Sequence, residues 1–145
     1  MADQPVQLTG LLKLGADAGT ATDVSAFVSK MIVHVSRSEV AIPATLANNT
    51  EGVAAGSFQY SLEIQFYSGL AATSLWAKLY TAALTDSAEL YFEGQLNSGA
   101  VGVDNPKWSG KIVVLTVDTG ADVGTLRQQS QTYKSTPAGF TKVVA

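Results

Sequence analysis

The segment that decides the fold reads SFQYSLEIQF and spans residues 57–66. Its polar and apolar residues alternate without a fault over the whole length. Because successive side chains of a β-strand point to opposite faces of a sheet, this alternation predicts a strand with one face in a core and the other outside. The apolar face consists of Phe58, Tyr60, Leu62, Ile64 and Phe66, and the polar face consists of Ser57, Gln59, Ser61, Glu63 and Gln65.

Other segments predict further strands, because they combine apolar alternation with β-branched residues. The run IVVLTV, residues 112–117, is apolar almost throughout, which indicates a strand buried on both faces. The predicted strands span residues 6–14, 27–36, 89–96, 111–118, 125–134 and 140–144.

Residues 69–84 follow a different period. Their apolar residues, among them Leu75, Trp76 and Leu79, recur at spacings of three and four, which predicts an amphipathic helix packed through one stripe. Ser68 is the candidate N-cap of this helix. A single helix among about six to eight antiparallel strands is typical of a mainly-β fold, so we expect a β-sandwich or barrel flanked by one helix. A chain of 145 residues predicts one domain, with an N-terminal arm over residues 1–5 and a C-terminal tail over residues 136–145.

The composition excludes several classes of site. The chain has no cysteine and only one histidine, His34, which rules out disulfides, thiolate metal centres and histidine clusters. Its net charge of −3 argues against an electrostatic grip on nucleic acid. Charged residues make up 14% of the chain, against roughly 25% in an average soluble domain. A surface so poor in charge defends weakly against self-association, and we expect neither a metal nor a cofactor.

One motif points to catalysis. The tetrapeptide from Asp118 to Ala121, DTGA, follows an apolar strand, as the catalytic aspartate of retroviral-type aspartic proteases does. Only 27 residues follow Asp118, however, which leaves no room for a flap, so a turn between strands is the favoured interpretation. His34 has no nucleophile elbow to serve, and no phosphate-binding glycine loop occurs. We therefore predict that the chain is not an enzyme.

Residues 38–56 predict a long loop that contains Pro43 and two glycines. This segment is too apolar for a freely solvated loop, which leaves two interpretations. Either the loop binds a partner, or its first half continues the preceding strand beyond the body as a projecting hairpin. Its candidate contact residues are Val40, Ile42, Leu46, Asn48, Asn49 and Val53.

The order of several short motifs resembles the major tail (tail tube) proteins of long-tailed, siphovirus-like phages, particularly those that infect actinobacteria. The motifs are DVS at 23–25, GSFQYSLE at 56–63, LWAKL at 75–79, NPK at 105–107 with WSG at 108–110, and GTL at 124–126. The resemblance implies a structural subunit that assembles into stacked hexameric rings, forming the conduit for DNA ejection. It also implies other copies of the chain and other tail proteins as partners, no membrane, and a place in the virion after synthesis in the bacterial cytoplasm.

Within this resemblance, the polar face of residues 57–65 is the candidate lumen or interface surface. The segment 38–56 is the candidate ring-stacking loop, with the six contact residues named above. The same polar face fits a monomer in which it is merely solvated. Two other functions stay open, a carbohydrate-binding β-sandwich module and another tail component such as a tail terminator.

Overall fold

The computed structural model describes residues 10–67, 75–97, 99–118 and 128–144. In this part of the chain, seven strands, one α-helix and one short 3-10 helix follow one another. In chain order they are β1 (Leu11–Gly15), β2 (Thr22–Asp23), η1 (Ser25–Phe27), β3 (Val28–Ile42), β4 (Gly52–Tyr67), α1 (Leu75–Ala83), β5 (Glu89–Gln95), β6 (Lys107–Val113) and β7 (Gln128–Val143).

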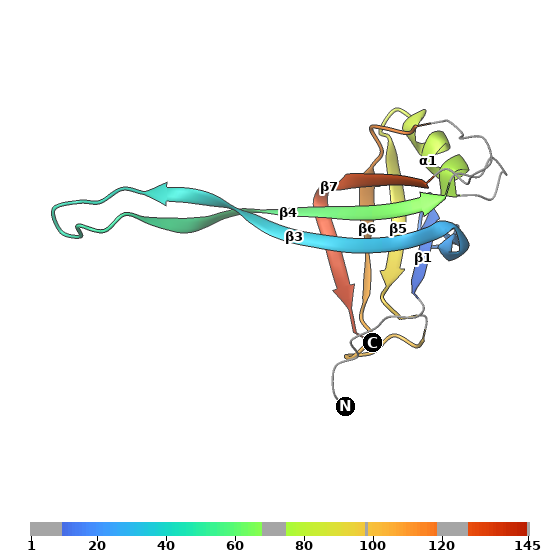
Figure 1. The fold of residues 1–145 in the computed structure, drawn as a ribbon, viewed down its shortest axis with the longest axis horizontal. Coiled ribbons are helices and arrows are strands. Elements are labelled where there is room, and N and C mark those ends of the chain that lie inside the picture. Colours follow the sequence, from blue (N-terminus) through green and yellow to red (C-terminus); the bar gives the residue numbers. More distant parts are fainter. Residues whose placement is uncertain (1–9, 68–74, 98, 119–127, 145) are drawn as a thin grey trace.

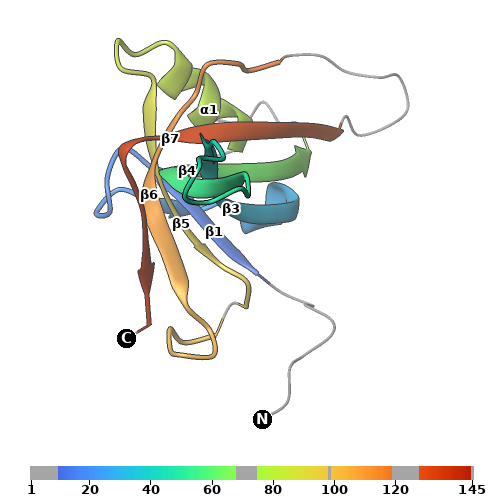
Figure 2. The ribbon, with the colours of Figure 1, turned by 90° about the vertical axis from the view of Figure 1, so that its left-hand side faces the viewer.

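The seven strands form a single antiparallel sheet in the order β2-β1-β5-β6-β7-β4-β3. Strand β7 belongs to both halves of it, because residues 128–134 pair with β4 and residues 135–143 pair with β6. Figures 1 and 2 show β7 turning the corner, so that β3 and β4 cross over β1, β5 and β6. The mainly-β fold of antiparallel strands with one helix is confirmed. The sheet folds over on itself but does not close into a barrel.

The corner of β7 has a local cause. Gly110 of β6 pairs with Phe140 but Ile112 pairs with Ser135, so residues 136–139 bulge out of the ladder. This segment contains Pro137, which has no N–H to donate. It also contains Gly139 at φ +71°, a backbone conformation that glycine adopts without a steric penalty. The tail predicted for residues 136–145 is therefore wrong over residues 136–143, which form the corner and the end of β7.

The core lies between the two halves of the sheet. The alternation of residues 57–66 places Leu62, Ile64 and Phe66 in it, each at most 1% exposed. Phe58 of the predicted core face is 58% exposed, because β4 at that point has run past the end of β7. Phe92 on β5 and Ile112 on β6 meet them from the other half of the sheet. Helix α1 covers one end of this core (Figure 1).

The helix buries the stripe that the sequence indicated. Leu75 and Leu79 are fully buried, whereas Trp76 is half-buried and stacks on Tyr80 with ring centroids 5.1 Å apart. The indole N–H of Trp76 donates to the backbone oxygen of Asp118 (3.1 Å). Residues 69–74 of the predicted helix, and its candidate cap Ser68, lie outside the described residues.

Several strand predictions were wrong in their bounds. The apolar run after Lys111 leaves the sheet at Val113, where the partner strand β5 begins at Glu89, and Leu115 is 83% exposed. That run is therefore not a strand buried on both faces. The segments predicted as two strands, 125–134 and 140–144, belong to one strand, β7, as far as they are described. Residues 6–9 lie outside the described part, and β1 begins at Leu11.

The long loop predicted over residues 38–56 is also wrong. Strand β3 continues to Ile42 and β4 begins at Gly52, so only residues 43–51 connect them. The second interpretation, a projecting hairpin, is confirmed, and Figure 1 shows it extending far beyond the body.

Candidate interaction surface

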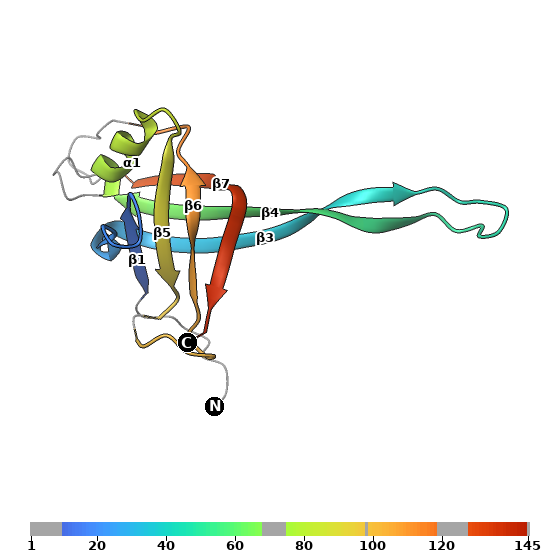
Figure 3. The ribbon, with the colours of Figure 1, turned by 180° about the vertical axis from the view of Figure 1, so that it is seen from behind.

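In the half of the sheet formed by β3, β4 and β7, strand β7 is shorter than the hairpin that β3 and β4 form. Strand β7 accompanies β4 only from Tyr67 to Ser61, whereas β3 pairs with β4 as far as Ile42 and Gly52. Residues 35–60 therefore form a two-stranded ribbon with its turn, which we call the projecting hairpin. Figures 1 and 3 show it reaching away from the body.

Large apolar side chains cover the projecting hairpin. Six of them are between 47% and 109% exposed, although each would be stabilised by burial. A two-stranded ribbon is marginally stable on its own in water, and contiguous exposed apolar surface marks sites of interaction. The six are Val35, Val40, Ile42, Leu46, Val53 and Phe58.

A chain of aromatic contacts fixes the base of the projecting hairpin to the core. Phe92 meets Phe140 edge to face (4.7 Å between centroids), and Phe140 meets Tyr60 (5.6 Å). Tyr60 stacks on Phe58 (6.1 Å), and the Arg37 guanidinium lies 4.5 Å from the centroid of the Phe58 ring. These contacts give the hairpin a defined direction relative to the body.

A β-bulge crosses the hairpin just beyond this base. Arg37 pairs with Phe58 and Glu39 pairs with Ala55, so between these pairs two residues of β4 lie opposite one residue of β3. The Arg37 Nε donates to the Gly56 oxygen (3.0 Å), and the Ser57 N–H donates to the Ser38 Oγ (3.1 Å). A Cβ at Gly56 would collide with the Ser38 Oγ, so the bulge requires glycine there.

The six candidate ring-stacking residues all lie on the projecting hairpin and are exposed. One of them also shapes the turn, because the Asn48 oxygen accepts the Thr45 N–H (2.7 Å) and the Asn48 Oδ1 accepts the Thr50 N–H (3.3 Å). Leu46 stands fully in solvent at the tip. The hairpin thus presents apolar side chains on a structured ribbon rather than on an irregular loop.

The polar face of β4 divides between the body and the hairpin. Ser61, Glu63 and Gln65 lie over the body, where β3 and β7 flank them, while Ser57 and Gln59 lie on the hairpin. The Glu63 Oε2 is 3.7 Å from the Lys30 Nζ and 3.6 Å from the His34 Nε2. The candidate lumen face is therefore not acidic, because Lys30 of β3 lies beside Glu63 and Lys134 of β7 lies opposite Ser61.

The opposite half of the sheet has its own ion pairs. Lys107 lies 3.6 Å from Glu93, and Lys111 lies 3.8 Å from Glu89, across the pairing of β5 with β6. Tyr91 donates its hydroxyl to the Glu93 Oε1 (2.8 Å). Burial, followed by this bond to Glu93, raises the pKa of Tyr91 above its ordinary value. These contacts satisfy the lysines beside Trp108 within the chain.

His34 and Asp118, the described residues considered for catalysis, contact different partners, His34 lying beside Glu63. Asp118 accepts hydrogen bonds at its backbone oxygen from Gln129 (3.0 Å) and at Oδ2 from Gln131 (3.0 Å). Burial raises the pKa of the neighbouring Tyr133, and the charge of Asp118 raises it further. The rest of the DTGA motif lies outside the described residues. Within the described part, no group of histidine, aspartate and glutamate side chains could hold a metal ion.

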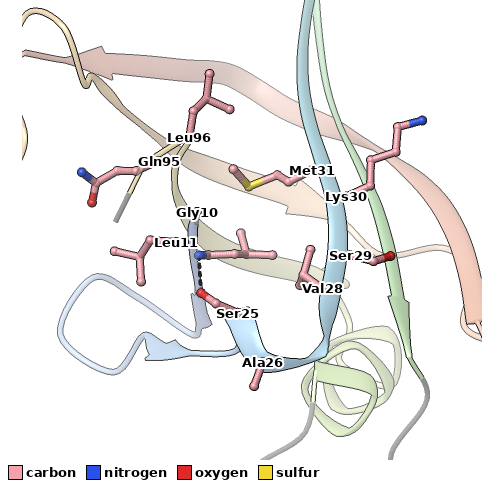
Figure 4. A pocket seen from close by; sticks show the side chains of 11 residues that line it. Gly10, Leu11, Ser25, Ala26, Val28, Ser29, Lys30, Met31, Gln95 and Leu96 are labelled. Carbon is pink, nitrogen blue, oxygen red and sulfur yellow. Dashed lines mark hydrogen bonds between the residues drawn. The ribbon is translucent and has the colours of Figure 1, made fainter. Parts of the chain in front are cut away.

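A cleft of about 620 Å³ opens where the sheet fails to close, between the start of β3 and the strands β1 and β5. Figure 4 shows Leu11, Val28, Met31 and Leu96 around it, with the Lys30 ammonium turned away. The Ser25 hydroxyl accepts the Leu12 N–H (2.9 Å) and so closes the free edge of β1. The described lining of the cleft offers apolar surface, and no acid, base or metal ligand points into it.

The described part of the chain contains no helix long and apolar enough to cross a membrane. No protein-family model matches the sequence, and no curated protein sequence shows significant similarity to it.

Proposed function

We propose that this chain is the structural subunit of a phage tail tube, which assembles into stacked hexameric rings and forms the conduit for DNA ejection. The observation that carries the proposal is the projecting hairpin, a fixed ribbon with six exposed apolar side chains that points away from the core. Such a surface is costly for a protein that works as a monomer and useful for one that binds copies of itself.

The edges of the sheet support the same proposal. Strand β2, at one edge, has two residues, whereas β3, at the other edge, has 15 residues and no β-partner on its outer side among the described residues. A long, unpaired edge readily pairs with a strand of another chain. Pairing around a ring, combined with stacking through a different surface such as the projecting hairpin, produces a closed ring and then a tube.

The polar face of β4 suits a conduit. Ser61 and Gln65 are neutral, Glu63 pairs with Lys30, and Lys134 of β7 lies opposite Ser61 on the same face. So few basic groups hold phosphates only weakly, because tight binding of DNA needs many neutralised phosphates. Viral DNA would pass such a lumen without specific binding.

The ordered motifs that resemble tail tube proteins supply the biological setting. They favour a location in the virion tail, other tail proteins as further partners and a purely structural role without a cofactor. Several of these motifs lie at the positions that matter for the fold: GSFQYSLE begins at the bulge glycine, and WSG lies within β6 beside the corner of β7.

A carbohydrate-binding module is the second candidate, and one feature favours it. Tyr80 is 44% exposed and stacked on Trp76, which gives an aromatic platform on α1 of the kind that sugars contact. Binding of the monomeric protein to a glycan array, lost on Tyr80→Ala, would favour this function over the tube.

Deletion of residues 44–51 tests the proposed function. It shortens the tip of the projecting hairpin and leaves the core and the aromatic base intact. We expect the unaltered chain to form rings and tubes in sedimentation and negative-stain microscopy, and the deletion variant to stay monomeric with an unchanged circular dichroism spectrum. Leu115→Ser, at an exposed site away from the hairpin, is the control. An unaltered chain that stays monomeric at every concentration would refute the proposal.

A further inference from the structure

Helix α1 carries an aromatic pair in addition to the stripe that it buries. Trp76 and Tyr80 lie one helical turn apart, and their rings stack with an angle of 18° between the planes. Leu75 and Leu79 make the buried contacts of the helix, whereas Tyr80 keeps 44% of its surface exposed. Stacked tryptophan and tyrosine rings offer a large, rigid apolar surface with a polar edge, which is typical of binding sites.

A fixed carboxylate lies beside this aromatic pair. The bond from the Trp76 indole N–H to the Asp118 backbone oxygen (3.1 Å) holds Asp118 at the edge of the indole ring. The Gln131 Nε2 of β7 donates to the Asp118 Oδ2 (3.0 Å), which orients the carboxylate itself. Asp118 is exposed, and an ionised carboxylate accepts up to about four hydrogen bonds. The carboxylate is therefore held in place by the chain and still able to accept hydrogen bonds from a ligand.

An aromatic ring next to a fixed carboxylate matches the two sides of a sugar ring. A pyranose has a face of C–H groups, which packs on an aromatic ring, and an edge of hydroxyl groups, which donate to a carboxylate. The charge of Asp118 also selects among sugars, because an acidic sugar would bring a second negative charge to the same place. The site therefore favours sugars without a carboxylate of their own.

We infer that Tyr80 and Asp118 bind one neutral pyranose of a glycan, and that Trp76 and Gln131 hold these two residues in position. The inference concerns the folded subunit and goes beyond the proposed tube. To the aromatic platform of the second candidate function it adds the polar contacts and the charge of the ligand. Figure 1 shows α1 at the end of the body away from the projecting hairpin, so sugar binding does not depend on what the hairpin contacts.

A glycan array that presents neutral and acidic oligosaccharides tests the site on the intact protein. We expect binding to neutral glycans, and a Kd about tenfold higher where a uronic acid replaces the contacting sugar. For the neutral glycan that binds best, Tyr80→Ala should raise the Kd about tenfold, because the stacking surface is lost, and Tyr80→Phe should leave it unchanged. Asp118→Asn should raise the Kd about fivefold, because hydrogen bonds to a charged acceptor are stronger than those to a neutral one. Tyr67→Ala, at another exposed tyrosine, is the matched control.

A protein that binds no glycan on the array would overturn the inference, and so would binding that neither Tyr80→Ala nor Asp118→Asn weakens. If circular dichroism shows that Tyr80→Ala does not fold, Tyr80→Phe and Asp118→Asn give the decision, since equal affinities of these two variants contradict the site. Sedimentation of the same samples reports assembly separately. A chain that binds neutral glycans without forming tubes keeps the inference and loses the proposed function, whereas tubes that bind no glycan keep the proposed function and lose the inference.

Discussion

The double substitution Val40→Ser with Ile42→Ser changes one face of the projecting hairpin without touching the core. The two side chains are 52% and 47% exposed in the subunit, so about half of each remains to be buried by a partner. Full burial of a valine or isoleucine side chain stabilises by about 1.5–3 kcal/mol, and half of that is about 1 kcal/mol each. The pair therefore contributes about 2 kcal/mol to the contact, which corresponds to a change of roughly 30-fold in an association constant.

The assay is the concentration of protein at which rings and tubes first appear, followed by light scattering and sedimentation. We expect this concentration to rise by about one order of magnitude or more in the double variant. The free subunit should lose at most about 2 kcal/mol of stability, because only about half of each side chain is covered there. Leu84→Ser, an equally drastic change at an exposed site off the hairpin, serves as the matched control. A shift no larger than that of the control, in a variant that folds normally, would refute the role given to the hairpin.

Three further changes test other parts of the molecule. Glu63→Lys puts a second ammonium beside Lys30 on the candidate lumen face and should cost at most about 1 kcal/mol of stability, so assembly is permitted. We expect slower DNA ejection in a dye-release assay on reconstituted phage. Unchanged ejection would argue against a place for Glu63 in the lumen. Because the pKa of Tyr133 is raised, above pH 10.0 the unfolded chain releases a proton that the folded chain keeps, so the free energy of unfolding falls by up to about 1.4 kcal/mol per pH unit. Tyr133→Phe should remove this fall in urea unfolding measured below and above that pH. An unchanged dependence of stability on pH in the variant would contradict the prediction. Gly110→Ala would bring a Cβ to 2.6 Å from the Phe140 ring, so we expect the free energy of unfolding to fall by about 1–3 kcal/mol, as measured by thermal unfolding. A variant as stable as the parent would show that the backbone at the corner of β7 moves with little cost.

The central strand and the helix could be predicted because each follows one period over its length. The alternation of residues 57–66 needs no knowledge of its neighbours, since the core side is marked by Leu62, Ile64 and Phe66 themselves. The stripe through Leu75 and Leu79 is equally local. In both segments the pattern predicts the face, but not how far the body extends along it, since Phe58 and Tyr80 share these faces and are exposed.

The errors arose where pairing between distant segments decides the structure. The hairpin beyond Ser38 has no clean alternation, because a bulge shifts the register and the start of β4 consists largely of glycine and alanine. The apolar run after Lys111 has the composition of a strand, yet it stops pairing where β5 begins. Proline and glycine at the corner of β7 indicated a break between two strands, whereas the strand bends and continues.

The candidate interaction surface likewise has features that follow from local sequence patterns and features that depend on pairing between distant segments. The sequence identified Val40, Ile42, Leu46 and Val53 from their number in a segment poor in structure signals, whereas Phe58, predicted on the core face, is exposed as well. It could not show that Lys30 and His34 lie beside Glu63, because these residues meet only through the pairing of β3 with β4. Nor could it place Tyr60 between Phe58 and Phe140, since the contact depends on the corner of β7.

Electron cryomicroscopy of the purified chain at high concentration tests self-assembly through the projecting hairpin most directly. We predict hollow tubes of stacked rings, in which density for residues 35–60 of each subunit bridges to the neighbouring ring. Single subunits at every concentration, or tubes in which the hairpins extend into solvent, would contradict that result.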